Sequence, residues 1–330
     1  MRRICWTSAL AGAMTALLAC HPAIAAEKIR VLIIDGQNNH NWAAMTPPMK
    51  ATLEKTGRFT VDVATTPPQP KAPVKPKDEK DEAAQAKYKR EMDKFNESKA
   101  AYPTLMAKFR PDLTKYEVVL SNYNGDPWGA AFNKALETAL KEGKIGLVII
   151  HAANNAFGGW AEWNKMIGLG WRGKDFGDRV TVDDNGKVVR TPKGEGPDAG
   201  HGPQHEFKVI VRDSEHPVTQ GMPKEWMHAK DELYHGQRGP AENMHILATA
   251  YSAPEQKGTS AHEPMIWWIP YGKGRVFTTV MGHAMGNDIT AIRCIGFQTV
   301  MTRGCEWAAT EKVTLPVPKD FPGTASPKLD

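Results

Sequence analysis

The chain has 330 residues, with 42 basic and 37 acidic side chains and a formal net charge of +5 at pH 7. This balance, without a basic stripe that carries interleaved aromatic residues, argues against a nucleic-acid partner. The length suffices for one large α/β domain with a sizeable core, or for one domain with an insertion.

The first residues have the three parts of a secretory signal peptide. Two arginines precede a mainly apolar run over 4–19, and small residues follow with a cleavage site at Ala25 or Ala26. We therefore expect residues 1–26 to be a signal peptide and the mature protein to be periplasmic or secreted. A lipid anchor at Cys20 is the alternative, because LLAC resembles a lipoprotein box. No later stretch is long and apolar enough to cross a bilayer.

Residues 27–315 are predicted to form one domain whose first half repeats the order strand, polar loop, helix. The predicted strands and helices are strands at 28–34, 59–64, 116–120 and 146–150 and helices at 42–56 and 128–141. Short apolar runs without alternation are typical of strands buried on both faces, and their repeated order predicts a parallel, doubly wound sheet. The strand at 59–64 alternates instead and should lie nearer the edge.

A charged insertion at 66–110 interrupts this order. Its first part, 66–77, is rich in proline and lysine and should run extended, whereas 78–101 is a highly charged helix former. The apolar stripe of this helix is narrow and consists of Tyr88, Met92 and Phe95. We expect a surface arm that packs on its own domain or on a neighbouring subunit, which makes it the candidate surface for a homo-oligomer.

The second half of the domain is richer in loops. Asp184-Asn185-Gly186 is typical of a hairpin turn. A final helix is expected over 288–301, before a proline-rich tail at 316–330. The further predicted strands cover 206–212, 244–251, 264–270 and 275–282.

Two cysteines remain in the mature chain, Cys294 and Cys305. Eleven residues along one continuous helix span roughly 16 Å, too far for a disulfide. A bridge therefore requires the last helix to end near Gly304. Two buried free thiols are the alternative.

Several cofactor and catalytic signatures are missing from the sequence. There is no G-x-G-x-x-G after the first strand, no phosphate-binding P-loop, no G-x-S-x-G elbow and no H-E-x-x-H zinc helix. We therefore expect no nucleotide cofactor.

Two histidines follow apolar strands, His151 after 146–150 and His283 after 275–282. The carboxyl ends of parallel strands meet at one edge of a sheet, so we expect both side chains to face the same cleft. There they are candidate catalytic groups and candidate ligands of a divalent metal ion. A lone histidine is otherwise more often a buried structural residue.

A third candidate catalytic group is Glu232. Alternate residues of an extended segment share a face, so Glu232 and Tyr234 should point together while Asp231 points away. A carboxylate beside a phenol and imidazoles suits acid/base catalysis, although an ion pair with a surface base is an equal alternative.

The remaining candidates would bind substrate. Trp171 and Arg172, in a glycine-rich loop, form the pair best suited to stack on a sugar ring and hydrogen-bond its hydroxyls. The other candidates for substrate binding, with Tyr234, are His40, Asn124, Asn154 and His205.

Taken together, several motifs resemble those of the ThuA-like, or trehalose-utilisation, family. They span most of the chain from residue 28 to about 307 and leave out the charged insertion. The motifs, in chain order, are IIHAANNAF, WRG, GHGPQHEF, HPVTQGMP, DELYH, RGPAEN, EPMIWWIPYGKGRVF and MGH. The DELY and YGKGRVF blocks, in this order, are the most specific.

The resemblance implies a fold similar to the class I glutamine amidotransferases, which have a flavodoxin-like, mostly parallel sheet. In true amidotransferases a cysteine nucleophile stands at the elbow after the central strand. Here that place belongs to His151, and neither Cys294 nor Cys305 is near it in the sequence. Cysteine-dependent glutamine hydrolysis is therefore not expected.

The resemblance also implies a role in sugar metabolism. The leading hypothesis is an exported enzyme, a hydrolase or lyase, that acts on a disaccharide or 3-keto-glycoside by acid/base or metal-assisted chemistry. A noncatalytic sugar-binding or assembly module that has lost the nucleophile is the alternative. An amidohydrolase that uses a metal-bound water is a third.

Overall fold

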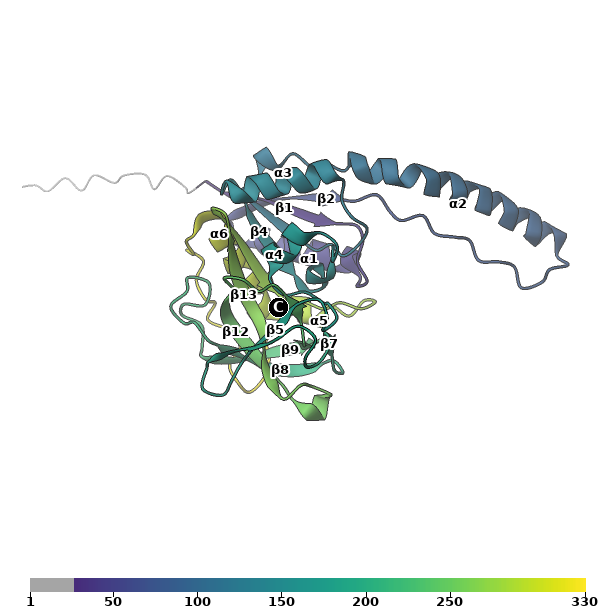
Figure 1. Ribbon diagram of the computed structural model, residues 1–330. Helices are drawn as coiled ribbons and strands as arrows, with labels where there is room; N and C mark the ends of the chain where they lie inside the picture. Colours follow the sequence, from purple (N-terminus) through teal and green to yellow (C-terminus); the bar gives the residue numbers. More distant parts are fainter. Residues whose placement is uncertain (1–26) are drawn as a thin grey trace, which may run out of the picture.

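The structure, a computed structural model, describes residues 27–330. The expected signal peptide at 1–26 and the candidate lipid-anchor residue Cys20 lie outside the described residues. Within this range the main feature is a twelve-stranded mixed sheet flanked by helices (Figure 1). None of the helices between residues 27 and 330 is both long and apolar enough to cross a membrane.

One half of the sheet is a parallel ladder in the order β2-β1-β3-β4-β14. Its strands are β1 (Ile29–Asp35), β2 (Phe59–Thr65), β3 (Val118–Ser121), β4 (Gly146–Ile150) and β14 (Gly274–Thr279). The apolar runs predicted these strands, and β2 lies at the edge as its alternating pattern indicated. The prediction at 275–282 was too long, because the chain leaves the sheet after Thr279.

The other half of the sheet is antiparallel and continues from β14 in the order β13-β12-β8-β9. Its strands are β13 (Ala261–Tyr271), β12 (His245–Ser252), β8 (His205–Val211) and β9 (Glu225–Asp231). The side branch and the small separate sheet contain β5 (Asp178–Val182), β6 (Val188–Thr191), β11 (Arg238–Gly239), β7 (Gly200–His201) and β10 (Tyr234–His235). The predicted hairpin joins β5 to β6, with Gly186 at a φ of +81° in the turn.

Helices cover both faces of the parallel half. They are α1 (Trp42–Lys55), α3 (Ala130–Lys141), α4 (Ala161–Ile167), α5 (Thr290–Arg293) and α6 (Ile295–Thr310), with short 3-10 turns at Leu113–Lys115, His151–Asn155 and Pro254–Gln256. Alternate residues of β4 serve the two faces: Val148 joins the core formed with α1 and α6, and Leu147 joins the core formed with α3 and α4. This two-sided burial confirms the doubly wound α/β fold.

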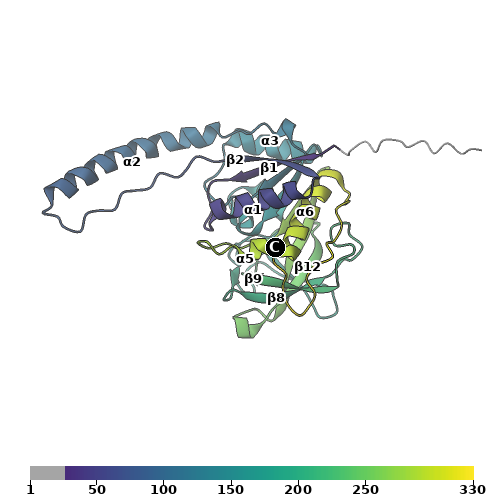
Figure 2. The same ribbon diagram turned by 180° about the vertical axis from the view of Figure 1, so that it is seen from behind.

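The charged insertion forms a projecting arm. The extended proline-rich segment runs out from β2, and helix α2 (Glu82–Lys108) returns beside it to the body (Figures 1 and 2). Only Met106 of α2 is buried. At the base of the arm, the Tyr102 hydroxyl donates to Asp126 (2.8 Å) and accepts from the Gln37 amide (2.6 Å).

The last helix differs from its prediction. The chain breaks at Cys294, between α5 and α6, and α6 then runs on to Thr310. The C-terminal tail returns at this break, where Ile295 N–H donates to the Lys328 carbonyl (2.8 Å). Cys294 and Cys305 are both buried and free, so the disulfide alternative is wrong.

Candidate active site

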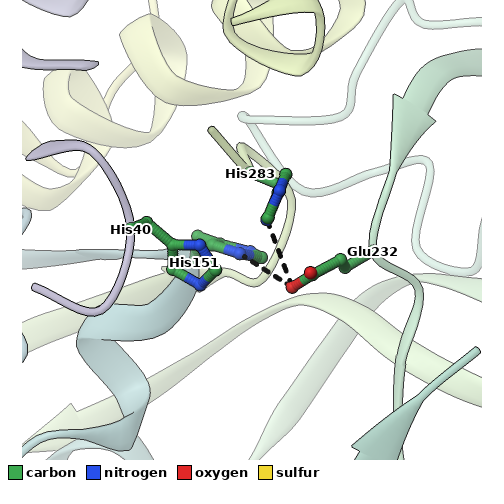
Figure 3. A group of neighbouring side chains, drawn as sticks. All are labelled: His40, His151, Glu232 and His283. Atoms are coloured by element: carbon green, nitrogen blue, oxygen red, sulfur yellow. Dashed lines mark ion pairs between the residues drawn. The ribbon is translucent and has the colours of Figure 1, made fainter. Parts of the chain in front are cut away.

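Four side chains from distant parts of the sequence meet at one point (Figure 3). His40 comes from the loop after β1, His151 directly follows β4, His283 lies just beyond β14, and Glu232 directly follows β9. One ligand atom from each lies within 4.8 Å of the others. All four side chains are buried, between 0% and 7% exposed. We call this group the His/Glu cluster.

The strand order explains part of this convergence. Three of the four residues follow strands of the parallel ladder, whose carboxyl ends face one side. Glu232 is different, since β9 stands at the far end of the strand order. The sheet curls so that the end of β9 meets the end of β14, and there Gly282 N–H donates to Asp231 (2.7 Å).

His151 occupies the sharp turn after the central strand. Its φ is +46°, a left-handed backbone conformation that residues other than glycine rarely adopt. Its Nδ1 lies 2.7 Å from the Val280 carbonyl, which only accepts, so Nδ1 carries the proton. Nε2 points into the cluster, 3.1 Å from the Tyr234 hydroxyl and 3.5 Å from Glu232.

Glu232 is surrounded by imidazoles. Its carboxylate lies 3.2 Å from Nδ1 of His283 and 3.4 Å from Nε2 of His201, besides its contact with His151. Burial on its own raises the pKa of Glu232, but hydrogen bonding and charge from His151 and His283 outweigh burial and hold the pKa below its usual range. The carboxylate is therefore ionised at neutral pH.

Asp231 fixes the backbone on which the cluster stands. Its carboxylate accepts from the N–H groups of Glu232 (2.6 Å), Gly282 (2.7 Å) and His283 (3.1 Å), and from His228 Nε2 (2.7 Å). Asp231 points away from Glu232's imidazole partners, as strand alternation predicted, but it is fully buried rather than exposed. Its oxygens are occupied, so Glu232 is the carboxylate of the pair that faces the cluster.

Tyr234, Trp171 and His201 form an aromatic group beside the cluster. The Tyr234 ring lies 4.8 Å from the Trp171 ring and 6.3 Å from the His201 ring, centroid to centroid. β10 pairs with β7 so that Tyr234 stands opposite His201. His201 is part exposed, so this group borders the cluster on its solvent side.

The loop at 200–205 brings His201 and Gln204 to the cluster, whereas the sequence predicted His205. The Gln204 amide lies 2.8 Å from Nε2 of His283, and His201 contacts Glu232. His205 instead donates from Nδ1 to the Pro203 carbonyl and packs on Phe207, away from the cluster. The GHGPQHEF motif marked this loop, but a single sequence does not show which of its side chains turns inward.

Arg172 makes its hydrogen bonds to the loop after β4 and to α4. Its guanidinium donates to the carbonyls of Asn155 (2.7 Å) and Ala156 (2.6 Å) and to Asn164 Oδ1 (3.2 Å). Burial lowers the pKa of Arg172 to about 10. These contacts hold the guanidinium against the loop after β4, so sugar binding by Arg172 stays a prediction, while its neighbour Trp171 reaches the aromatic group.

The two asparagine candidates donate to neighbouring amide side chains and not to the cluster itself. Asn154 is buried and donates to Gln237, and its own Oδ1 has no partner. Asn124 donates to Asn39 (2.7 Å), whose amide in turn lies 3.2 Å from His40 Nε2. Asn124 therefore reaches the cluster through one intermediate side chain.

A polar hollow of about 450 Å³ opens next to His40. It is lined by loops after β1 and β3 and by the start of the insertion; among its lining residues are Asn38, Asn39, Trp42, Gln69, Lys71 and Asn124. Amides, an ammonium group and one indole are side chains that suit a hydroxyl-rich ligand.

The cluster offers imidazole nitrogens and a carboxylate, which are groups for proton transfer and for metal binding. These four side chains could hold a metal ion. Neither cysteine takes part in the turn after β4: Cys294 caps α6 and Cys305 lies inside that helix.

A doubly wound sheet with a strained residue directly after its central strand defines the flavodoxin-like, glutamine amidotransferase-like class of α/β proteins. The family model ThuA, described as trehalose utilisation, matches residues 73–308. The chain belongs to this family.

Solved structures agree with this assignment. A protein described as ThuA-like from Parabacteroides merdae is 39% identical, with a TM-score of 0.78, over 92% of this chain and 98% of that one. A ThuA-like protein from Bacteroides uniformis is 16% identical, with a TM-score of 0.52, over 89% and 97% of the two chains, and shares the fold. No curated protein matches the sequence.

Proposed function

We propose that this protein is an enzyme of sugar metabolism that acts on a disaccharide or a 3-keto-glycoside by acid/base or metal-assisted chemistry. The observation that carries the proposal is the buried convergence of three imidazoles, one phenol and one ionised carboxylate in a protein of the trehalose-utilisation family. No nucleotide cofactor is required for such chemistry.

The number of available carboxylates bears on the reaction. Most glycoside hydrolases use two carboxyl groups that flank the scissile bond. Here Glu232 faces the cluster, but both carboxylate oxygens of Asp231 already accept hydrogen bonds, from three backbone N–H groups and from His228. This arrangement favours a substrate that already carries a ketone, because a ketone lets one base cleave a neighbouring glycosidic bond by elimination.

In that elimination a base removes the proton from the carbon between the ketone and the anomeric carbon. The electron pair forms a double bond to the anomeric carbon and expels the glycosidic oxygen, which takes a proton from an acid. The products are a cyclic enone and the free alcohol, without oxidant, reductant or water. In this proposal, and without a bound ion, Glu232 acts as the base and a neighbouring imidazole as the acid.

Substrate would bind beside the cluster. Trp171 and Tyr234 offer aromatic surface on one side, and the polar hollow that includes Asn39 and Trp42 offers hydrogen-bonding groups on another. The second sugar of a disaccharide fits the chemistry of that hollow.

Incubating the purified protein with trehalose, other glucosides and their 3-keto forms, with and without Zn²⁺ or Mn²⁺, tests the proposal. We expect release of the free alcohol from a keto form, with an enone absorbance, and a loss of roughly 10²–10⁴-fold in rate in Glu232→Gln. His245→Ala changes an exposed histidine that stacks on Trp268 and should keep the wild-type rate. No turnover in any combination would contradict the proposal.

A noncatalytic sugar-binding module is favoured by one observation, the histidine at the position of the missing nucleophile. Saturable sugar binding without consumption of any substrate would support that function instead. The same incubations, followed by calorimetric titration, separate the two.

We also propose export through a signal peptide at 1–26, with a lipid anchor at Cys20 as its alternative. N-terminal sequencing of protein recovered from an expressing bacterium would find Glu27 or a nearby residue first, or a blocked, lipid-modified Cys20. An intact Met1 in the mature protein would contradict export.

A further inference from the structure

The distances within the His/Glu cluster match those between ligands of one ion. Nε2 of His151 and Nδ1 of His283 lie 3.5 Å and 3.2 Å from the same oxygen of Glu232. An ion roughly 2.1 Å from each of four tetrahedral ligands sets neighbouring ligand atoms about 3.4 Å apart. The two distances to Glu232 match this spacing, and one ligand atom from each of the four side chains, His40 included, lies within 4.8 Å of the others (Figure 3).

Each imidazole is held by its outer nitrogen. Nδ1 of His151 is held by the Val280 carbonyl, Nε2 of His40 lies 3.2 Å from the Asn39 amide, and Nε2 of His283 lies 2.8 Å from the Gln204 amide. Metal-binding histidines are usually oriented by such a partner on the nitrogen that does not bind. A side-chain amide can donate to an unprotonated ring nitrogen through its NH₂ group or, after a flip, accept from a protonated one through its oxygen. The two ends of the amide have nearly the same shape, so either arrangement fits.

The inner nitrogens lack ordinary partners. Nδ1 of His40 is buried and has no hydrogen bond, and the buried Nδ1 of His283 faces the Glu232 carboxylate at 3.2 Å. Buried imidazole nitrogens rarely remain unpaired, because nothing compensates for the water they lose. A cation between them and Glu232 would satisfy both nitrogens and the carboxylate at once.

We propose that His40, His151, Glu232 and His283 bind one divalent transition-metal ion, of the zinc or iron type. Three nitrogen ligands exclude Mg²⁺ and Ca²⁺, which take oxygen ligands. Imidazole with one carboxylate suits zinc and iron. The sequence indicated His151 and His283 as ligands, and the fold adds His40 and Glu232.

The surroundings are built to keep this geometry. Asp231 binds the backbone N–H groups of both Glu232 and His283, so it sets the two segments against each other. The left-handed turn at His151 aims its Nε2 inward. Fixed ligand positions are what a metal site requires of its protein.

With the ion in place, Glu232 is a ligand, and proton transfer falls to His201 and Tyr234 at the border of the cluster. This assignment rests on the proposed function; the metal site itself does not. His201→Asn should therefore lower turnover of a keto-glycoside at saturating metal, while its loss of metal affinity stays within the roughly 10–100-fold of an outer-shell change.

Metal binding can be measured without any substrate. Purified protein, stripped with a chelator, is titrated with Co²⁺, whose visible bands report nitrogen and oxygen ligands, and with Zn²⁺ in competition with a chromophoric chelator. We expect about one ion per chain. His40→Ala, His151→Ala, His283→Ala and Glu232→Gln should each lose more affinity than the roughly 10–100-fold typical of an outer-shell change such as Gln204→Leu.

His245→Ala is the control and should bind as the wild type does. Circular dichroism and thermal melting of each variant exclude unfolding as the cause, and His40→Ala, in a loop outside the sheet, is the variant least able to disturb the fold. Absence of saturable uptake of Co²⁺, Zn²⁺ or Fe²⁺ would overturn the proposal, as would wild-type affinity in all four ligand variants. Metal binding without sugar turnover would reject the proposed function alone.

Discussion

Asp231 is the residue on which the cluster most depends for its shape. It is fully buried and accepts four hydrogen bonds, one of them from His228. Burial alone lowers the pKa of His228, but the neighbouring Cys294 and Asp231 outweigh it and raise the pKa to about 9. His228 therefore carries a buried positive charge, and the carboxylate of Asp231 is its partner.

We predict that Asp231→Ala lowers the free energy of unfolding by about 3–5 kcal/mol, because it leaves a buried charge unpaired and three backbone N–H groups without an acceptor. Urea unfolding followed by tryptophan fluorescence measures this loss. Asp184→Ala is the control: its side chain is 94% exposed, and we expect a change within about 0.5 kcal/mol. Equal stability of the two variants would contradict the role given to Asp231.

His216 should make the fold sensitive to acid. Its Nδ1 accepts the Val218 N–H (3.2 Å), and burial, aided by His245 and opposed by Asp213, lowers its pKa from the usual 6.5 to about 4. Between these values the unfolded chain binds the proton and the folded chain does not, so stability falls as the pH falls.

We predict that the titration of His216 lowers the free energy of unfolding of the wild type by on the order of 1 kcal/mol between about pH 7 and pH 4.5, after allowance for the partial exposure of His216. His216→Gln removes the titrating group, so the variant should lose less stability than the wild type over that range. Urea unfolding of both proteins at the two pH values gives the difference. An identical pH dependence would show that His216 does not titrate in this way.

At the scale of elements, α6 packs closely on the sheet because it carries Gly304. A Cβ atom there would lie 2.4 Å from Cε1 of Phe277, a fully buried ring of β14. Larger side chains do not fit between this helix and this strand without a shift of one of them.

We therefore predict that Gly304→Ala destabilises the protein by about 1–2 kcal/mol, although alanine by itself favours a helix by about 1 kcal/mol. Gly323→Ala, where nothing lies within 4 Å of the added carbon, should be nearly neutral. Thermal unfolding compares the variants. Adding Phe277→Leu to Gly304→Ala should reveal coupling between the two sites; additive losses would argue against the contact.

At the scale of the molecule, the arm and the body are nearly independent. The outer part of α2 buries none of its side chains, and the arm is tied to the body at its base through Tyr102 and Met106. Pro70 and Ser98 line one hollow, so a short linker can join residue 71 to residue 98.

We predict that replacing 72–97 by such a linker changes the melting temperature by less than about 2 °C, because no core area is lost. If copies associate through the arm, as the sequence suggested, the same deletion converts the oligomer to monomer in light scattering. An intact oligomer would place the interface elsewhere. A large drop in melting temperature would show that the arm supports the body.

The local sequence was enough for the parallel half of the sheet and for His151. Short apolar runs form strands that are buried on both faces, whatever the rest of the chain does. The residue after the central strand of such a parallel sheet faces the side where ligands bind. The arm was equally evident, because a highly charged helix has too little apolar surface to enter a core.

Tertiary structure decided which side chains meet. Glu232 reaches His151 only because the antiparallel half curls until β9 meets β14, and no local pattern encodes that closure. Gln204 turns inward instead of His205, and Arg172 turns toward carbonyls of the loop after β4, because backbone groups compete for these side chains. Side-chain direction depends on contacts with residues far away in the sequence, and only the folded chain supplies them.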